Sequence, residues 1–247
     1  MKGGIINSEW KKFNTNFFSD KFTNLIQFNL ADFKTENKIP FIGISDISND
    51  ILTNMCDALK HNTSLLELDI NYNEINDSGA KALADMLKSN KTLTNLNVGF
   101  NDITQDGASD LAEALKINKT LTILDISENN DIGDKGAIVL AEALKTNTSL
   151  TELNIAYTGI GNKGAKALAY MLKNNSTLTE LNISYNNIND EGTQALAEAL
   201  KTNTTLTKLD LSKNNVTVLS SDLIKQINIK LNENYTKKQQ MSFYENE

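Results

Sequence analysis

Residues 93–120 have the sequence LTNLNVGFNDITQDGASDLAEALKINKT, and segments of the same pattern follow one another along most of the chain. Each segment begins L-x-x-L-x-[ILV]-x-x-[NT] and ends at a further asparagine. These asparagines are spaced by 28, 28, 29, 28 and 28 residues and stand at Asn62, Asn90, Asn118, Asn147, Asn175 and Asn203. A fixed period of this length is typical of a solenoid of stacked repeats.

Each repeat divides into two halves with different hydrophobic periods. Leu96 and Val98 alternate with polar residues, which predicts a strand with one buried face. From Gly107 onward, apolar residues recur every three or four positions, which predicts an amphipathic helix. We expect these helices to end at the Asn62-type residue in a left-handed conformation. We expect their N-caps two residues before the repeat glycine, at Asp77, Asp134, Asn162 and Asp190.

One such unit cannot bury both its strand face and its helix face, whereas stacked units can. Neighbouring strands lie about 4.8 Å apart and packed helices about 8–10 Å apart, so the stack must curve. The predicted fold is therefore an α/β horseshoe with a parallel sheet on the concave side and helices on the convex side. The polar residue that ends each strand segment should point inward and bind the backbone of adjacent turns. These residues are Asn73, Asn101, Asn129 or Asn130, Thr158, Asn186 and Asn214.

This pattern resembles the leucine-rich repeat family, in particular the long α/β repeats of the ribonuclease-inhibitor subclass. The resemblance covers residues 62–218. It implies a curved solenoid whose usual task is to bind another protein. Similar repeats occur in NOD-like receptors, in the GTPase-activating protein for Ran and in effectors of intracellular bacteria.

The two ends of the chain depart from the repeat. Residues 1–61 contain an aromatic cluster, two degenerate strand segments and one repeat-like helix, and we expect them to form an N-terminal cap. Residues 62–218 hold the repeats. Residues 219–247 begin with a helical apolar stripe, which predicts a C-terminal cap helix, and end in a polar tail.

Composition excludes several classes of function. The net charge is −7, and all 24 basic residues are lysines, so nucleic acid is a poor candidate partner. One Cys cannot build a thiolate zinc site, and one His cannot complete a multi-histidine metal site. No apolar stretch approaches the length of a membrane span, and no signal peptide is apparent, so we expect a cytoplasmic protein. We also expect a monomer. Export into a host cytosol without a cleaved signal would leave the same sequence. We expect no cofactor.

Three motifs suggest chemistry but fit the repeat better. Residues 159–164 form G-x-G-x-x-G, yet Gly164 is the repeat glycine, so we do not expect dinucleotide binding. The calcium-like Asp125-x-Ser127-x-Asn129 lacks the later glycine and glutamate of a calcium loop. Cys56 falls on an apolar helix stripe, which predicts an inert buried thiol. The recurring Asn-x-Ser/Thr sequons follow from the repeat, because a helix-ending Asn precedes a strand-leading Ser or Thr.

The concave face is the candidate site. Its outward strand positions are rich in acids, and the next exposed column is rich in aromatic residues. The candidate anchors are Tyr72, Phe100, Tyr157 and Tyr185. The candidate electrostatic guides are Glu67, Asp69, Asp125, Glu152 and Glu180. A charged face is often merely solvated, but aromatic residues beside acids suit a surface that binds a protein.

Two function hypotheses follow from different classes. The first is a non-enzymatic scaffold that binds a basic or amphipathic protein on its concave face, with a pathogen-effector role as one setting. The second is a GTPase-activating protein of the Ran type, which rests on likeness of fold alone. The absence of Arg excludes an arginine finger from this chain.

Overall fold

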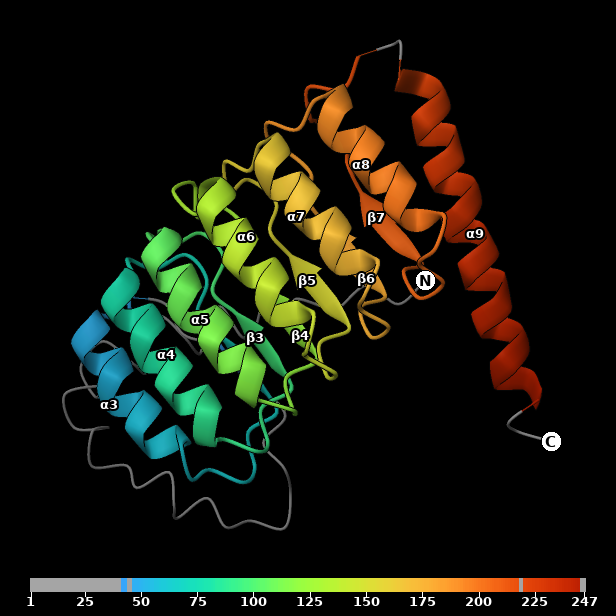
Figure 1. The fold of residues 1–247 in the computed structure, drawn as a ribbon. Helices are drawn as coiled ribbons and strands as arrows, with labels where there is room; N and C mark the ends of the chain where they lie inside the picture. The colour runs from blue at the N-terminus through green and yellow to red at the C-terminus, as the bar shows by residue number, and fades with distance from the viewer. Residues whose placement is uncertain (1–40, 44–45, 218–219, 245–247) are drawn as a thin grey trace, which may run out of the picture.

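The computed structural model describes residues 41–43, 46–217 and 220–244. They form a solenoid in which short parallel strands alternate with helices (Figure 1). The strands are β1 (Phe41–Gly43), β2 (Glu67–Asp69), β3 (Asn95–Asn97), β4 (Ile123–Asp125), β5 (Glu152–Asn154), β6 (Glu180–Asn182) and β7 (Lys208–Asp210). The helices are α3 (Asn49–Leu59), α4 (Asp77–Ser89), α5 (Gln105–Ile117), α6 (Gly133–Leu144), α7 (Asn162–Leu172), α8 (Asp190–Leu200) and α9 (Ser221–Tyr244).

The sheet has the order β1-β2-β3-β4-β5-β6-β7, and every neighbouring pair is parallel and in register. From β2 to β6 the central residue of each strand is buried, and the two flanking residues are half-buried. The central positions are occupied by leucines such as Leu68, Leu96 and Leu124, each about 1% exposed. The predicted α/β horseshoe is thus confirmed, with the buried strand face turned toward the helices.

The repeat helices lie side by side on the outer face of the sheet (Figure 1). Their Gly-Ala-x-x-Leu-Ala-x-x-Leu stripe forms the buried side, as Gly107, Ala108, Leu111 and Leu115 illustrate in α5. The glycine is needed because a Cβ at Gly107 would lie 2.5 Å from the Asp77 Oδ1 of the preceding repeat. Close packing of this kind explains why the repeat keeps one glycine at the first turn.

The predicted helix N-caps are wrong by one residue in α4, α7 and α8, and by two in α6, where Ile132 rather than Asp134 is the N-cap. Asn76 caps α4, and its side chain accepts a hydrogen bond from the Ser78 N–H at 2.9 Å. Asp77 lies inside the first turn and reaches the next repeat instead. Its Oδ1 accepts hydrogen bonds from the Thr104 and Gly107 N–H groups, at 2.8 and 2.9 Å. The acidic residue therefore caps the neighbouring helix, a role that no single repeat can reveal.

The expected inner asparagine ladder is confirmed. The amide nitrogen of Asn101 donates to the backbone oxygens of Ile70, Val98 and Gly99, and its Oδ1 accepts from Ile75 N–H. In the third repeat Asn129 takes this place, and Asn130 is exposed. Thr158 supplies one hydroxyl, which donates to the Ile155 carbonyl.

The helix-ending asparagines form a second ladder, although not in the predicted conformation. Asn90 has φ −64° and ψ 135°, so it is extended rather than left-handed. The side chain of Asn118 is fully buried and donates to the Leu87 carbonyl at 2.8 Å. Its Oδ1 accepts hydrogen bonds from the N–H groups of Thr120 and Leu121. The sequon asparagines are thus buried and hydrogen-bonded.

The ends of the solenoid differ from its centre. Most of the predicted N-terminal cap, including its aromatic cluster, lies outside the described residues. Within them, β1 pairs with β2, and α3 packs on α4. At the other end α9 packs on α8, buries Ile227 and Leu231, and runs on to Tyr244, where a polar tail was expected. The division of the chain at residues 61 and 218 stays a prediction.

Candidate functional site

On the concave face, the outward-facing residues of neighbouring strands lie side by side and form rows across the sheet. A groove of about 290 Å³ lies over β4 to β7. Its lining includes Asp125, Glu152, Glu180, Lys208 and Asp210. The structure thus places three of the five predicted guides around one shallow depression, while Glu67 and Asp69 lie on β2.

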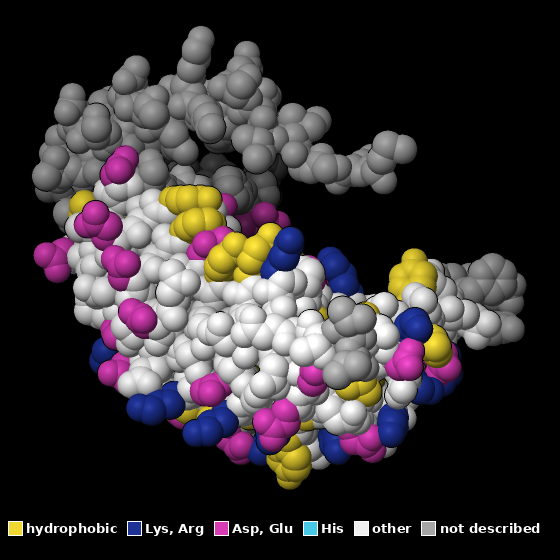
Figure 2. All heavy atoms as spheres, turned by 90° about the horizontal axis from the view of Figure 1, so that it is seen from above, with side chains coloured by type: hydrophobic (Ala, Val, Ile, Leu, Met, Phe, Trp, Pro, Cys, Tyr) yellow, Lys and Arg dark blue, Asp and Glu magenta, His cyan; other side chains and the backbone are white. Residues whose placement is uncertain are grey.

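Beside these strands lies a column of side chains, one from each repeat, which we call the aromatic column. Five of them are exposed, and Glu128 is half-buried. Its members are Tyr72, Phe100, Glu128, Tyr157, Tyr185 and Lys213. The four aromatic members are the predicted anchors, and their exposed fractions are 65%, 39%, 38% and 42% in chain order. Figure 2 shows hydrophobic side chains in two adjacent groups on the upper rim of the molecule, with acidic side chains nearby.

The aromatic residues form two stacked pairs. The ring centroids of Tyr72 and Phe100 are 4.0 Å apart, and those of Tyr157 and Tyr185 are 4.1 Å apart. Both pairs have an interplanar angle of 15°. Glu128 occupies the column position between the pairs, and Lys213 occupies the position after the second pair. The column therefore offers two apolar platforms separated by a carboxylate.

All six members of the column have a left-handed backbone, with φ between 52° and 59°. Such a conformation is uncommon for residues other than glycine, and it costs about 1–3 kcal/mol at each position. Asparagine or glycine would fit with less strain. Sequence reasoning identified the side chains of this column but missed its backbone conformation.

The left-handed turn is held by the residue at the end of each strand. The Oδ1 of Asp125 accepts hydrogen bonds from the Ser127 N–H at 2.9 Å and from the Ser127 hydroxyl. Asp69 accepts from the Asn71 N–H at 3.1 Å in the same way. These two predicted guides therefore shape the turn that presents the aromatic column. The other oxygen of Asp125 accepts from the Asn154 amide at 2.7 Å.

The remaining guides differ in their charge environment. Glu180 forms an ion pair with Lys208 at 2.9 Å, so part of its charge is neutralised. Burial and the neighbouring Glu180 raise the pKa of Glu152. Burial and the charge of Asp125 likewise raise the pKa of Glu128. A cation bound near these carboxylates would relieve their mutual repulsion.

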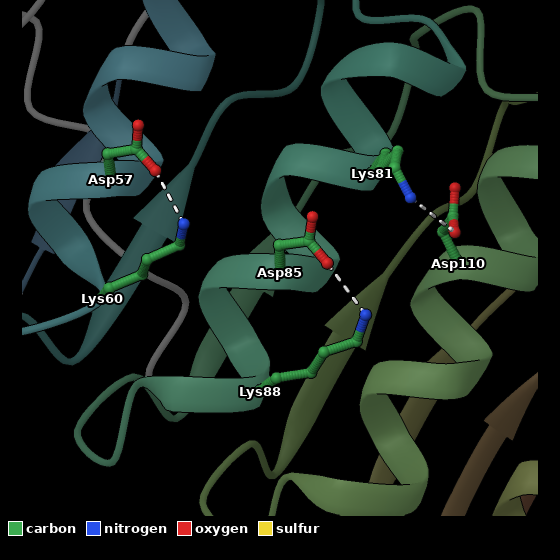
Figure 3. A network of polar contacts seen from close by, with 6 residues as sticks. All are labelled: Asp57, Lys60, Lys81, Asp85, Lys88 and Asp110. Atoms are coloured by element: carbon green, nitrogen blue, oxygen red, sulfur yellow. Dashed lines mark hydrogen bonds and ion pairs between the residues drawn. The ribbon is translucent and has the colours of Figure 1, made fainter.

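The convex face has a different character. Its charges pair locally, as Lys60 with Asp57 and Lys88 with Asp85 show in Figure 3. Lys81 also approaches Asp110 of the next helix, at 3.7 Å. Exposed pairs of this kind contribute about 0–1 kcal/mol and leave little net charge for a partner.

The structure also explains the motifs for which the sequence predicted no chemical role. The Gly161 and Gly164 N–H groups, which a phosphate would need, donate to Asp134 Oδ1 at 2.8 and 2.7 Å. Cys56 is buried, and burial raises the pKa of its thiol to about 12. Among the described residues, no group of acidic, His or Cys side chains is arranged to hold a metal ion. Within the same residues, no helix is both long and apolar enough to cross a membrane.

Comparison with known proteins identifies relatives of this fold. The family model described as "TMOD/LMOD Leucine-rich domain" matches residues 24–136 and 129–243, well over half of the chain. The solved structure "Leiomodin-1 Actin-Binding Site 2 (ABS2)" is 27% identical, with a TM-score of 0.59 over 66% of this chain and 93% of that one. A tropomodulin C-terminal domain from Caenorhabditis elegans is 16% identical, with a TM-score of 0.54 over 80% and 99%. No curated protein sequence matches.

Proposed function

This chain belongs to the TMOD/LMOD leucine-rich domain family, and from that premise we propose that it is a non-enzymatic scaffold whose concave face binds another protein. The observation that carries the proposal is the aromatic column. Four large rings stand exposed at left-handed positions where glycine or asparagine would cost less strain. Strain that stability does not require is most simply explained by a binding function.

The stacked pairs suit the role of anchors. Aromatic side chains supply large contact areas at low entropic cost, and binding energy concentrates in such residues. Stacking fixes each ring against its neighbour before a partner arrives, so little side-chain entropy is lost on binding. The column therefore supplies two preformed apolar contacts.

The carboxylates favour a partner with positive charge opposite the gap between the pairs. Glu128 stands in that gap, and Glu152 lies in the adjoining groove. A basic or amphipathic segment could bury apolar side chains on the rings and place a Lys or Arg near Glu128. Such attraction would speed association, and salt would weaken it within a Debye length of about 8–10 Å.

Actin is the first partner to test, because the name of the 27% identical leiomodin-1 structure states an actin-binding site. The full chain would be titrated with actin at low and at high salt. Phe100→Ala and Tyr157→Ala should each weaken binding about tenfold or more if the column is the anchor. Tyr170→Ala is the matched control, because Tyr170 is a 57% exposed tyrosine on the convex helix α7.

The outcomes separate the partner from the surface. If actin does not bind, actin is excluded, and capture from a cell extract with these variants tests the surface alone. If a captured partner is kept by the column variants but lost on Tyr170→Ala, the concave site is wrong.

The Ran-type GTPase-activating function stays the alternative. A multiple-turnover GTP hydrolysis assay with candidate GTPases tests it, and acceleration by the chain would displace the purely scaffolding function. The effector role and the cellular compartment stay predictions from the sequence.

A further inference from the structure

The last repeat leaves the strand layer of the core partly uncovered. In the sixth strand segment Leu181, Ile183 and Ile188 are at most 1% exposed. Their counterparts one repeat later are less covered: Leu211 is 9% exposed, and Leu209 and Val216 are half-buried. A groove of about 460 Å³ lies here between the last strand segment and α9, lined by all three of these residues together with Ile224 and Ile227.

Among the described residues, some backbone N–H groups at this edge of the sheet also lack a hydrogen-bond partner. In the preceding repeat, Ile183 N–H donates to the Asp210 carbonyl at 3.0 Å, and Tyr185 N–H donates to the Ser212 carbonyl at 2.9 Å. Ile188 N–H donates to Asn214 Oδ1 at 3.0 Å. Among the described residues the corresponding N–H groups of Leu211, Lys213 and Val216 have no hydrogen-bond partner.

The three donors have the spacing of one repeat strand. In the preceding repeat, the equivalent N–H groups donate to three acceptors on the neighbouring strand segment. These are the Asp210 carbonyl, the Ser212 carbonyl and the Asn214 side chain, which are two residues apart from one another along the chain. A bound segment with acceptors at the same spacing would form hydrogen bonds with all three N–H groups of the last repeat.

Helix α9 determines what can enter this groove. It packs on α8, buries Ile227 and Leu231, and its Asn234 donates to the Asn203 and Leu206 carbonyls. It therefore occupies the helix layer where a next repeat would place its helix (Figure 1). A second copy that stacked through β1 would bring α3 into the same place. A single strand without a helix does not meet this obstacle.

We propose that the groove receives an extended segment of another protein as an eighth, parallel strand beside β7. Strand addition to a sheet edge is a general mode of peptide recognition, in which the backbone supplies affinity and alternate side chains supply specificity. This proposal does not depend on the concave site.

The register defines the chemistry of the segment. An acidic residue stands opposite Lys208, as Glu180 does on the other side. Apolar residues stand beside Leu209 and Leu211, and an Asn stands where its amide oxygen accepts from Val216 N–H. The segment therefore has the pattern [D/E]-Φ-x-Φ-x-x-N, where Φ is apolar.

A peptide with the sequence of residues 178–188, LTELNISYNNI, carries this pattern and serves as the probe. Its binding to the full chain is measured by fluorescence anisotropy. We expect saturable binding that survives Tyr72→Ala, because Tyr72 lies at the far end of the aromatic column. A peptide with Lys at the Glu180 position should bind more weakly.

N-methylation of the peptide backbone tests the strand geometry. The N–H at the Glu180 position would donate to the Thr207 carbonyl, as Lys208 N–H donates to Thr179. The N–H at the Ile183 position would face away from β7. We expect the first methylation to weaken binding at least tenfold and the second to leave it unchanged.

Absence of binding to the full chain would overturn the proposal, as would equal sensitivity at the two methylated positions. Self-association of the chain that the peptide disrupts would assign the groove to a second copy and would also overturn it.

Discussion

Replacing Tyr72 by glycine and by alanine separates the backbone strain of the aromatic column from its binding role. Both substitutions remove the ring and its stack on Phe100, so they differ only in the presence of a Cβ. At ordinary positions alanine is the more stabilising of the two. At Tyr72, where φ is 54°, we expect the order to reverse.

The size of the reversal follows from two opposing free energies. A left-handed backbone costs a residue with a Cβ about 1–2 kcal/mol. Alanine recovers about 0.4–1 kcal/mol of this, because it restricts the unfolded chain more than glycine does. Tyr72→Gly should therefore be about 0.5–1 kcal/mol more stable than Tyr72→Ala. For a chain of this size, the melting temperature moves by about 2–4 °C per kcal/mol.

Ile138 supplies the matched control, because it is a 42% exposed apolar residue inside α6. There alanine should exceed glycine by about 1 kcal/mol, since glycine is a poor helix former. Urea unfolding followed by circular dichroism measures both pairs. If alanine is the more stable residue at Tyr72 as well, the strain argument is refuted, and with it the main support for the binding surface. Both Tyr72 variants should lose partner affinity equally.

Three further outcomes are expected. Asn118→Ala should lower the free energy of unfolding by about 3–5 kcal/mol in urea titrations, because it leaves several buried backbone groups unpaired. As a control, substitution of the exposed Asn130 by Ala should change this free energy by less than about 0.5 kcal/mol. Gly107→Ala should cost about 1–3 kcal/mol by the same assay, because the added Cβ would lie 2.5 Å from a carboxylate oxygen of the neighbouring repeat. Affinity for a cationic partner, measured at a series of pH values, should fall as the pH drops through the raised pKa of Glu152, because the carboxylate then loses its charge. Glu152→Gln should remove that part of the decline.

The fold could be predicted from the sequence because the hydrophobic pattern within each repeat identifies its strand and its helix. The period-two and period-3.6 patterns around Leu96 and Leu111 identify the strand and the helix. The inner asparagine ladder was predictable too, since a polar residue at a buried strand end must satisfy backbone groups. The candidate guides, such as Glu67 and Asp69, were recognisable because alternation along a strand places every second residue outside.

Predictions failed where the decisive contact crosses from one repeat to the next. Asp77 has the sequence of an N-cap, yet its carboxylate binds the N–H groups of the following helix. Asp125 stays a predicted guide, but one of its carboxylate oxygens accepts a hydrogen bond from the Asn154 amide of the next repeat, a contact that the sequence did not indicate. Within one repeat, neither role differs visibly from an exposed acid.

The sequence alone therefore determined the repeat, its two secondary structures, the direction of curvature and the side chains of the concave face, because these depend on local periodicity. Only the tertiary structure decided which backbone groups remain free and which carboxylates remain available. The left-handed column from Tyr72 to Lys213 and the open edge at β7 depend on how neighbouring turns share their hydrogen bonds. That sharing is fixed by stacking, which is a property of adjacent repeats in space.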